Sequence, residues 1–175
     1  DIDILLPFIL KESSKHTQFI LAPHNTSSDS IDYFKKCFPE AICYSQILEN
    51  TDLKKASILI LDSVGLLSTT YKYATYAYIG GAFGAGLHNT IEATVYGIPV
   101  FFGRSPKNLK FKECQDLIVE GAAFEFSNLS DFMSYLEPLN SDYSNYQKAA
   151  DAAYTFTRSR QGATERIVTH LMKNS

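Results

Sequence analysis

Short apolar runs alternate with longer amphipathic stretches along most of the chain. Six runs rich in β-branched and aromatic residues predict strands, at residues 17–22, 41–44, 57–62, 76–80, 98–102 and 122–126. Most of these runs are almost continuously apolar, which is typical of strands covered on both faces. Stretches with a helical period lie near residues 2–13, 28–37, 64–74, 87–96, 108–120, 128–138, 142–156 and 162–173. This alternation predicts an α/β fold with a doubly wound parallel sheet.

In such sheets, ligands bind beyond the carboxyl ends of the strands. We therefore expect the loops at residues 23–27, 63–65 and 80–86 to open on one edge. The length of 175 residues suits a single domain, residues 1–175, in which residues 142–175 form C-terminal helices.

Composition narrows the classes of partner. Hydrophobic residues make up 45% of the chain and charged residues 20%, and the net charge is -3. These values indicate a globular domain without the basic excess that a nucleic-acid partner requires. Cys37, Cys43 and Cys114 form no CxxC pair, and the histidines occur singly, so we expect no metal site. No apolar run reaches the roughly 18 residues of a membrane span, and we expect these residues to be soluble by themselves.

The most informative segment is residues 78–103, YIGGAFGAGLHNTIEATVYGIPVFFG. A strand ends at Ile79, a loop rich in glycine and alanine follows as far as Gly86, and a helix is predicted from Leu87. Glycine permits positive φ and close approach of a ligand to the backbone. A helix N-terminus beside such a loop is suited to bind a phosphate or a carboxylate. Gly84 and Gly86 are therefore candidate binding residues.

The predicted helix is divided by face. Leu87, Ile91 and Val95 should face the core, while polar side chains share another face, those of His88, Asn89 and Glu92. A carboxylate there can accept hydrogen bonds from a ribose diol, and an amide can bond a phosphate or sugar oxygen. The alternative is a tight connection next to a solvated helix face, because a lone glycine pattern is a weak motif.

Three lysines and a group of tyrosines leave two interpretations open. Lys107, Lys110 and Lys112 are placed to reach a donor carboxylate, but a basic run is more often a solvated face. The tyrosines favour packing over a stacking platform; they are Tyr71, Tyr73, Tyr76 and Tyr78.

The stretch GGAFGAGLHNTIEATVYGIPVFFG resembles the signature of 3-deoxy-D-manno-octulosonic acid (Kdo) transferases, in which a glycine loop precedes His-Asn-x-x-Glu and Gly-x-Pro-Val-x-x-Gly. The resemblance extends over nearly the whole chain, through four further matches: Pro23-His24, the Leu61–Tyr71 stretch with Gly65, Lys110–Glu113 and Gly162–Glu165. It departs where His24 replaces an arginine and Leu66 a glutamate. An imidazole there would hold phosphate more weakly and with a pH dependence.

The resemblance implies the C-terminal, Rossmann-like half of a GT-B fold, beginning after that half's first strand. It implies a glycosyltransferase that binds CMP-Kdo and transfers Kdo to a lipid A precursor in lipopolysaccharide biosynthesis, at the cytoplasmic face of the inner membrane. It also implies no metal or other cofactor. The implied CMP-Kdo contacts are His24, Gly65, Gly84, Gly86, His88, Asn89 and Glu92.

No catalytic residue is expected in this chain, because in the family the base and the acceptor belong to the N-terminal half, which also provides the membrane association. We expect the chain to be part of a longer protein and to be inactive alone. Without the first strand, we expect an unpaired edge or a gap in the sheet, filled by upstream residues or by a strand-pairing dimer.

Two other functions compete with this one. The first is the donor half of another nucleotide-sugar GT-B enzyme, such as a UDP-sugar transferase or a UDP-N-acetylglucosamine 2-epimerase. The second is a non-enzymatic nucleotide-binding module.

Overall fold

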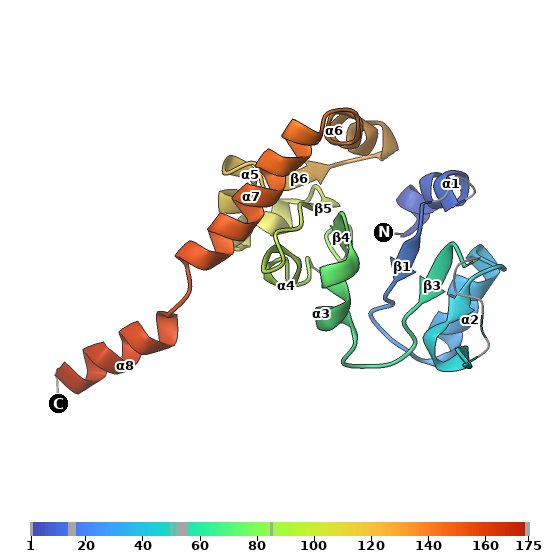
Figure 1. Cartoon of the computed structure of the whole chain (residues 1–175), viewed down its shortest axis with the longest axis horizontal. Coiled ribbons are helices and arrows are strands. Elements are labelled where there is room, and N and C mark those ends of the chain that lie inside the picture. Colours follow the sequence, from blue (N-terminus) through green and yellow to red (C-terminus); the bar gives the residue numbers. More distant parts are fainter. Residues whose placement is uncertain (1, 14–16, 50, 52–55, 85, 174–175) are drawn as a thin grey trace. The chain divides into compact units, whose positions relative to one another are not determined.

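The structure is a computed structural model that describes residues 2–13, 17–49, 51, 56–84 and 86–173. All six predicted strands are present, within a few residues of the predicted bounds (Figure 1). They are β1 (Phe19–Leu21), β2 (Ile42–Cys43), β3 (Ile58–Ile60), β4 (Ala77–Ile79), β5 (Val100–Gly103) and β6 (Ala123–Phe126). The α-helices are α1 (Ile2–Ser13), α2 (Ser28–Cys37), α3 (Leu67–Thr70), α4 (Ile91–Thr94), α5 (Lys112–Val119), α6 (Leu129–Ser141), α7 (Tyr143–Ser159) and α8 (Ala163–Lys173). The 3-10 helices are η1 (Tyr44–Gln46), η3 (Tyr71–Tyr73) and η4 (Pro106–Lys110).

The chain forms two compact units, residues 1–70 and residues 71–175. Each unit holds a three-stranded sheet, with strand order β1-β3-β2 in unit 1 and β4-β5-β6 in unit 2. Every strand pair is parallel, which confirms the predicted parallel α/β fold. The gap in the sheet, the single domain and the strand-pairing dimer stay predictions.

In unit 1, β3 is the central strand and two helices pack together beside the sheet. The Phe8 ring of α1 meets the Phe19 ring of β1 edge-on, with 6.0 Å between their centroids. The Tyr33 hydroxyl of α2 donates a hydrogen bond of 2.7 Å to the Asp3 carboxylate of α1. This bond, together with partial burial, raises the pKa of Tyr33 to about 12.

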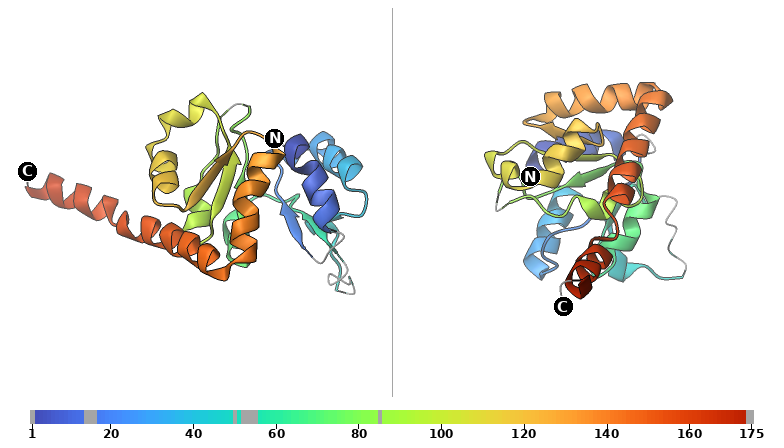
Figure 2. Two further views of the ribbon diagram at one scale, coloured as in Figure 1. Left: turned by 90° about the horizontal axis from the view of Figure 1, so that it is seen from above. Right: turned by 90° about the vertical axis from the view of Figure 1, so that its left-hand side faces the viewer.

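In unit 2, helices cover both faces of the sheet, as Figure 2 shows. The pairing of Phe101 with Phe124 puts both rings on the face covered by α6, where Phe101 also meets Phe132. The opposite face packs against α5, through buried side chains such as Cys114 and Leu117. Burial of these apolar side chains stabilises the fold, by about 25 cal/mol for each Å² of apolar surface removed from water.

The helix α7 packs against α4 and holds the segment that follows the glycine-rich loop. The buried hydroxyl of Thr157 lies 3.0 Å from the hydroxyl of Thr94 in α4. Gly97, with a φ of 70°, ends the turn after α4 and lies directly against α7, close to Ala150 and Tyr154. A side chain at this position would be strained and would meet Tyr154 at 3.4 Å. The contacts of Thr94 and Gly97 with α7 therefore anchor the segment between the glycine-rich loop and β5 to the core.

Two predicted helices are shorter than the pattern indicated. The stretch at 64–74 is helical only as α3 and η3, and the stretch at 87–96 only as α4. The predicted core face of the second was wrong in part, because Val95 is 45% exposed whereas Leu87 is buried. The predicted face assumes a helix that begins at Leu87, whereas residues 87–90 are not helical.

The C-terminal helices differ in their environment. Five residues of α7 are buried, whereas in α8 the described side chains of Ile167, Val168, Leu171 and Met172 are exposed. No helix in the described part of the chain is both long enough and apolar enough to cross a membrane.

Candidate functional site

The glycine loop (residues 80–86) follows β4 and folds back on its own backbone. The N–H groups of Gly84 and Gly86 donate to the Gly81 carbonyl oxygen at 2.9 and 3.0 Å. Gly81 has a φ of 97° and Gly86 of 142°, in the region that favours glycine. A Cβ on Gly81 would also collide with the Gly86 carbonyl group. The loop therefore depends on Gly81, which is not among the predicted binding residues, as well as on Gly86.

The predicted polar residues follow this loop directly. The His88 N–H donates to the Gly80 carbonyl at 3.1 Å, which ties the residue after the loop to the first residue of the loop. The Asn89 side chain then starts α4, because its Oδ1 accepts from the Ile91 N–H at 3.0 Å. Its Nδ2 donates to Glu92 Oε1 at 3.1 Å, so the expected meeting of Asn89 and Glu92 is observed. The predicted helical spacing of His88 and Glu92 was wrong, because His88 precedes α4 by three residues.

This cluster is accessible to a ligand. His88 and Asn89 are exposed and Glu92 is half-buried. Tyr71, in η3, lies near Glu92, and burial together with the Glu92 carboxylate raises the pKa of Tyr71 to about 12. Tyr71 is therefore a neutral hydroxyl at pH 7, placed beside a carboxylate. The sequence favours packing for Tyr71, because the proximity of Tyr71 to Glu92 depends on tertiary structure.

A second polar group lies at the carboxyl end of β5 and β6. Arg104 Nε lies 3.2 Å from Glu125 Oε2. Asn108 is fully buried and donates to Gly103 O at 2.8 Å and to Glu125 Oε1 at 2.9 Å. Next to it, the Lys107 ammonium group donates to the Gly84 carbonyl oxygen at 2.6 Å. Since β4, β5 and β6 are parallel, this group and the glycine loop share one edge of the sheet.

His24 and Gly65, the remaining predicted residues, belong to unit 1. His24 is exposed and follows the carboxyl end of β1, while Gly65 follows that of β3. Because β1 and β3 are parallel neighbours, both loops open on one edge of the sheet in unit 1. Gly65 has a φ of 89°, and a Cβ added there would meet no atom within 4 Å.

Asp62 lies just after β3, before the turn at Gly65. Burial opposes its ionisation, but hydrogen bonds from the backbone and hydroxyl of Ser45 outweigh that effect and hold the pKa of Asp62 below its ordinary value. Asp62 is thus a charged residue whose hydrogen bonds to Ser45 hold η1, the turn after β2, against the end of β3.

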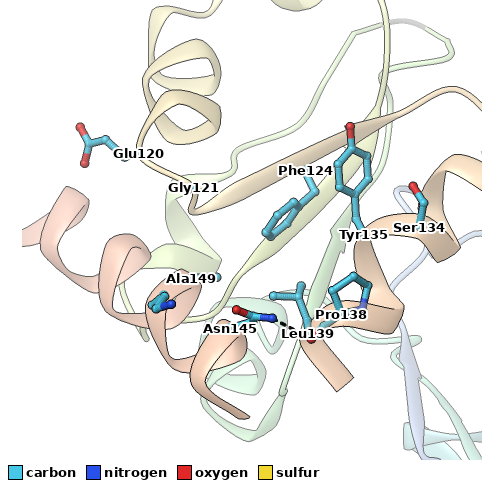
Figure 3. A pocket seen from close by; sticks show the side chains of 10 residues that line it. Glu120, Gly121, Phe124, Ser134, Tyr135, Pro138, Leu139, Asn145 and Ala149 are labelled. Atoms are coloured by element: carbon cyan, nitrogen blue, oxygen red, sulfur yellow. Dashed lines mark hydrogen bonds between the residues drawn. The ribbon is translucent and has the colours of Figure 1, made fainter. Parts of the chain in front are cut away.

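A hollow of about 300 Å³ lies elsewhere in unit 2, between α6, α7 and β6 (Figure 3). Phe124, Tyr135 and Leu139 line it, and Gly121 marks its rim just before β6 begins. Because β6 runs parallel to β4, this hollow is at the opposite edge of the sheet from the glycine loop. It is not part of the candidate site. Within the described residues, no three His, Cys, Asp or Glu side chains come together in a way that would hold a metal ion.

The known proteins that are similar in sequence to this chain include several glycosyltransferases. The chain is 28% identical over 132 residues to a 3-deoxy-D-manno-octulosonic acid transferase of Aquifex aeolicus, covering 74% of this chain and 35% of the relative. It is also 28% identical over 143 residues to the transferase of the same name from Rickettsia typhi, covering 79% of this chain and 30% of the relative. A bifunctional glycosyltransferase/methyltransferase of Fusobacterium nucleatum is 26% identical over 100 residues, 57% of this chain and 16% of that protein. No family model matches the chain.

Among solved structures, the chain is similar to the C-terminal CMP-Kdo binding domain of WaaA from Acinetobacter baumannii. The TM-score is 0.71 at 16% identity, over 89% of this chain and 80% of that domain. These findings confirm the resemblance to Kdo transferases and the fold of the C-terminal half of a GT-B protein. The chain spans about a third of the length of the Kdo transferases it matches.

Proposed function

We propose that this chain binds the nucleotide-sugar donor CMP-Kdo and belongs to a glycosyltransferase that adds Kdo to a lipid A precursor in lipopolysaccharide biosynthesis. The observation that carries the proposal is the bonded Asn89–Glu92 pair beside the glycine loop. It is supported by the similarity to Kdo transferases and to a CMP-Kdo binding domain.

The chemistry of the site suits a nucleoside monophosphate. The Glu92 carboxylate is an acceptor that can take hydrogen bonds from both ribose hydroxyls. Asn89 directs one amide N–H to Glu92, and its second N–H is available for a phosphate or sugar oxygen. The glycine loop brings peptide groups without side chains to the same place, which lets a phosphate approach the backbone closely. In this proposal Gly84, Gly86 and His88 surround the phosphate.

His24 and Gly65 are proposed donor contacts from unit 1, through an imidazole and a backbone N–H group. We assign no residue of this chain as the catalytic base. Because the relatives are about three times as long, we place the base, the acceptor site and the association with the cytoplasmic face of the inner membrane in the rest of the protein.

Calorimetric titration of the intact protein with CMP, UMP and UDP tests the nucleotide. We expect CMP to bind at least about tenfold more tightly than UMP and UDP, which corresponds to about 1.4 kcal/mol. Tighter binding of UDP would favour a UDP-sugar enzyme instead. If CMP binds but the intact protein transfers no Kdo from CMP-Kdo to a lipid A precursor, the chain is a nucleotide-binding module and the enzymatic part of the proposal is wrong.

A further inference from the structure

Lys107 links two segments that are far apart in the sequence. Its ammonium group donates a hydrogen bond of 2.6 Å to the carbonyl oxygen of Gly84 in the glycine loop. Lys107 itself lies in η4, which follows β5. The lysine therefore reaches over the carboxyl edge of the sheet to the loop that we propose surrounds a phosphate.

The backbone that carries Lys107 is fixed on both sides. Before it, the Ser105 hydroxyl oxygen accepts from the Lys107 N–H at 3.3 Å and caps η4. After it, the buried Asn108 amide bonds Gly103 and Glu125, as described above. A lysine on a mobile loop would lose much side-chain entropy on binding. Here the anchored backbone and the bond to Gly84 restrict the ammonium group beforehand.

The charge of Lys107 also distinguishes it from three other cations of unit 2. Arg104 is paired with Glu125, Lys112 with Asp116, and Arg160 with Glu120. The partner that the structure gives to the Lys107 ammonium is an uncharged carbonyl oxygen, and the side chain is exposed. An ammonium group has three N–H donors. After the bond to Gly84, two donors and the full positive charge face the surroundings of the loop.

We propose that Lys107 binds the phosphate of the donor nucleotide and selects for phosphorylated over unphosphorylated ligands. This inference rests on the proposed function, since it places the phosphate at the glycine loop. The Kdo carboxylate is the other anionic group of the donor that an ammonium could bind. We favour the phosphate because Lys107 is bonded to the loop itself, and an oxygen held by that loop lies within reach of the same ammonium group.

Binding measurements on the intact protein distinguish this role from a structural one. In a Lys107→Gln variant we expect CMP to bind about tenfold more weakly, while cytidine, which lacks the phosphate, binds as it does to the unaltered protein. CMP binding should also become less sensitive to salt, because the screened charge pair is gone. A Lys107→Arg variant keeps the charge and should retain most of the affinity. Lys148→Gln, at an exposed lysine of α7, is the matched control and should bind CMP normally.

Three results would overturn the inference. Equal weakening of CMP and cytidine would mean that Lys107 only holds the loop in place. Unchanged CMP affinity together with a raised KM for CMP-Kdo would assign the lysine to the sugar carboxylate. Unchanged values for both ligands would leave it a surface lysine. Each of these presupposes that the unaltered protein binds CMP; absence of that binding would refute the proposed function itself, and this inference with it.

Discussion

Two glycine turns follow strand ends in this chain, and they differ in how much of the structure depends on the glycine. Gly65, after β3, has a φ of 89°, and an added Cβ would meet nothing within 4 Å. Gly81, after β4, has a φ of 97°, and an added Cβ would collide with the Gly86 carbonyl and lie 3.2 Å from the His88 ring. Gly65 is required by backbone conformation alone, whereas Gly81 is required by conformation and by packing.

The difference indicates where binding is most sensitive to substitution. The loop at Gly81 is held by its own hydrogen bonds, by His88 and by Lys107, so a change at one point displaces several groups. The turn at Gly65 is exposed and can absorb a local change. The following substitutions test this contrast.

Gly81→Ala should have the largest effect. Positive φ costs an alanine about 1–3 kcal/mol, and relief of the collision adds about 1–3 kcal/mol. We expect the free energy of unfolding to fall by roughly 2–6 kcal/mol. CMP affinity should fall by roughly 10–150-fold, because displaced loop N–H groups lose hydrogen bonds to a charged phosphate that are each worth about 1.5–3 kcal/mol. Denaturant unfolding and CMP titration measure the two. Retention of full CMP affinity would show that the loop backbone does not form the phosphate site.

Glu92→Gln should weaken CMP binding and leave the fold intact. Loss of a charged hydrogen-bond partner costs about 1.5–3 kcal/mol, which is about 10–150-fold in affinity. Glu137→Gln is the control, because Glu137 is an exposed residue of α6. Circular dichroism checks the fold and calorimetry the affinity. A Glu92→Gln variant that binds CMP as tightly as the control would return Glu92 to the role of a solvated helix residue.

Gly65→Ala should destabilise the protein less than Gly81→Ala does. The strain of a left-handed alanine is about 1–2 kcal/mol, and no collision adds to it. We expect the free energy of unfolding to fall by that amount, clearly less than in Gly81→Ala under the same conditions. A loss equal to that of Gly81→Ala would contradict the contrast between the two turns. Weaker CMP binding in this variant would support Gly65 as a donor contact.

The order of elements was predictable because it depends on local patterns. Apolar runs such as those ending at Ile60 and Ile79 are strands in the structure, and the breaks after them are loops. The parallel arrangement followed from the alternation of strands and helices. The motif around Asn89 and Glu92 was also predictable, since residues three apart can meet whenever a helix begins between them.

The start of α4 could not be predicted in the same way. The periodic pattern from Leu87 onward suits a helix, but the His88 N–H bonds the Gly80 carbonyl and the Asn89 side chain caps Ile91. A capped start competes with helix extension, because an asparagine side chain replaces the missing backbone partner. The helix consequently begins at Ile91, and Val95 faces outward.

The sequence by itself determined the α/β order, the strand ends that carry glycine turns, and the polar set at His88, Asn89 and Glu92, because these depend on residues adjacent or nearly adjacent along the chain. Only the tertiary structure decided that Lys107 reaches Gly84 and that Tyr71 lies near Glu92. The members of these pairs are 23 and 21 positions apart along the sequence. Their proximity arises from strand pairing and helix packing, which no local pattern specifies.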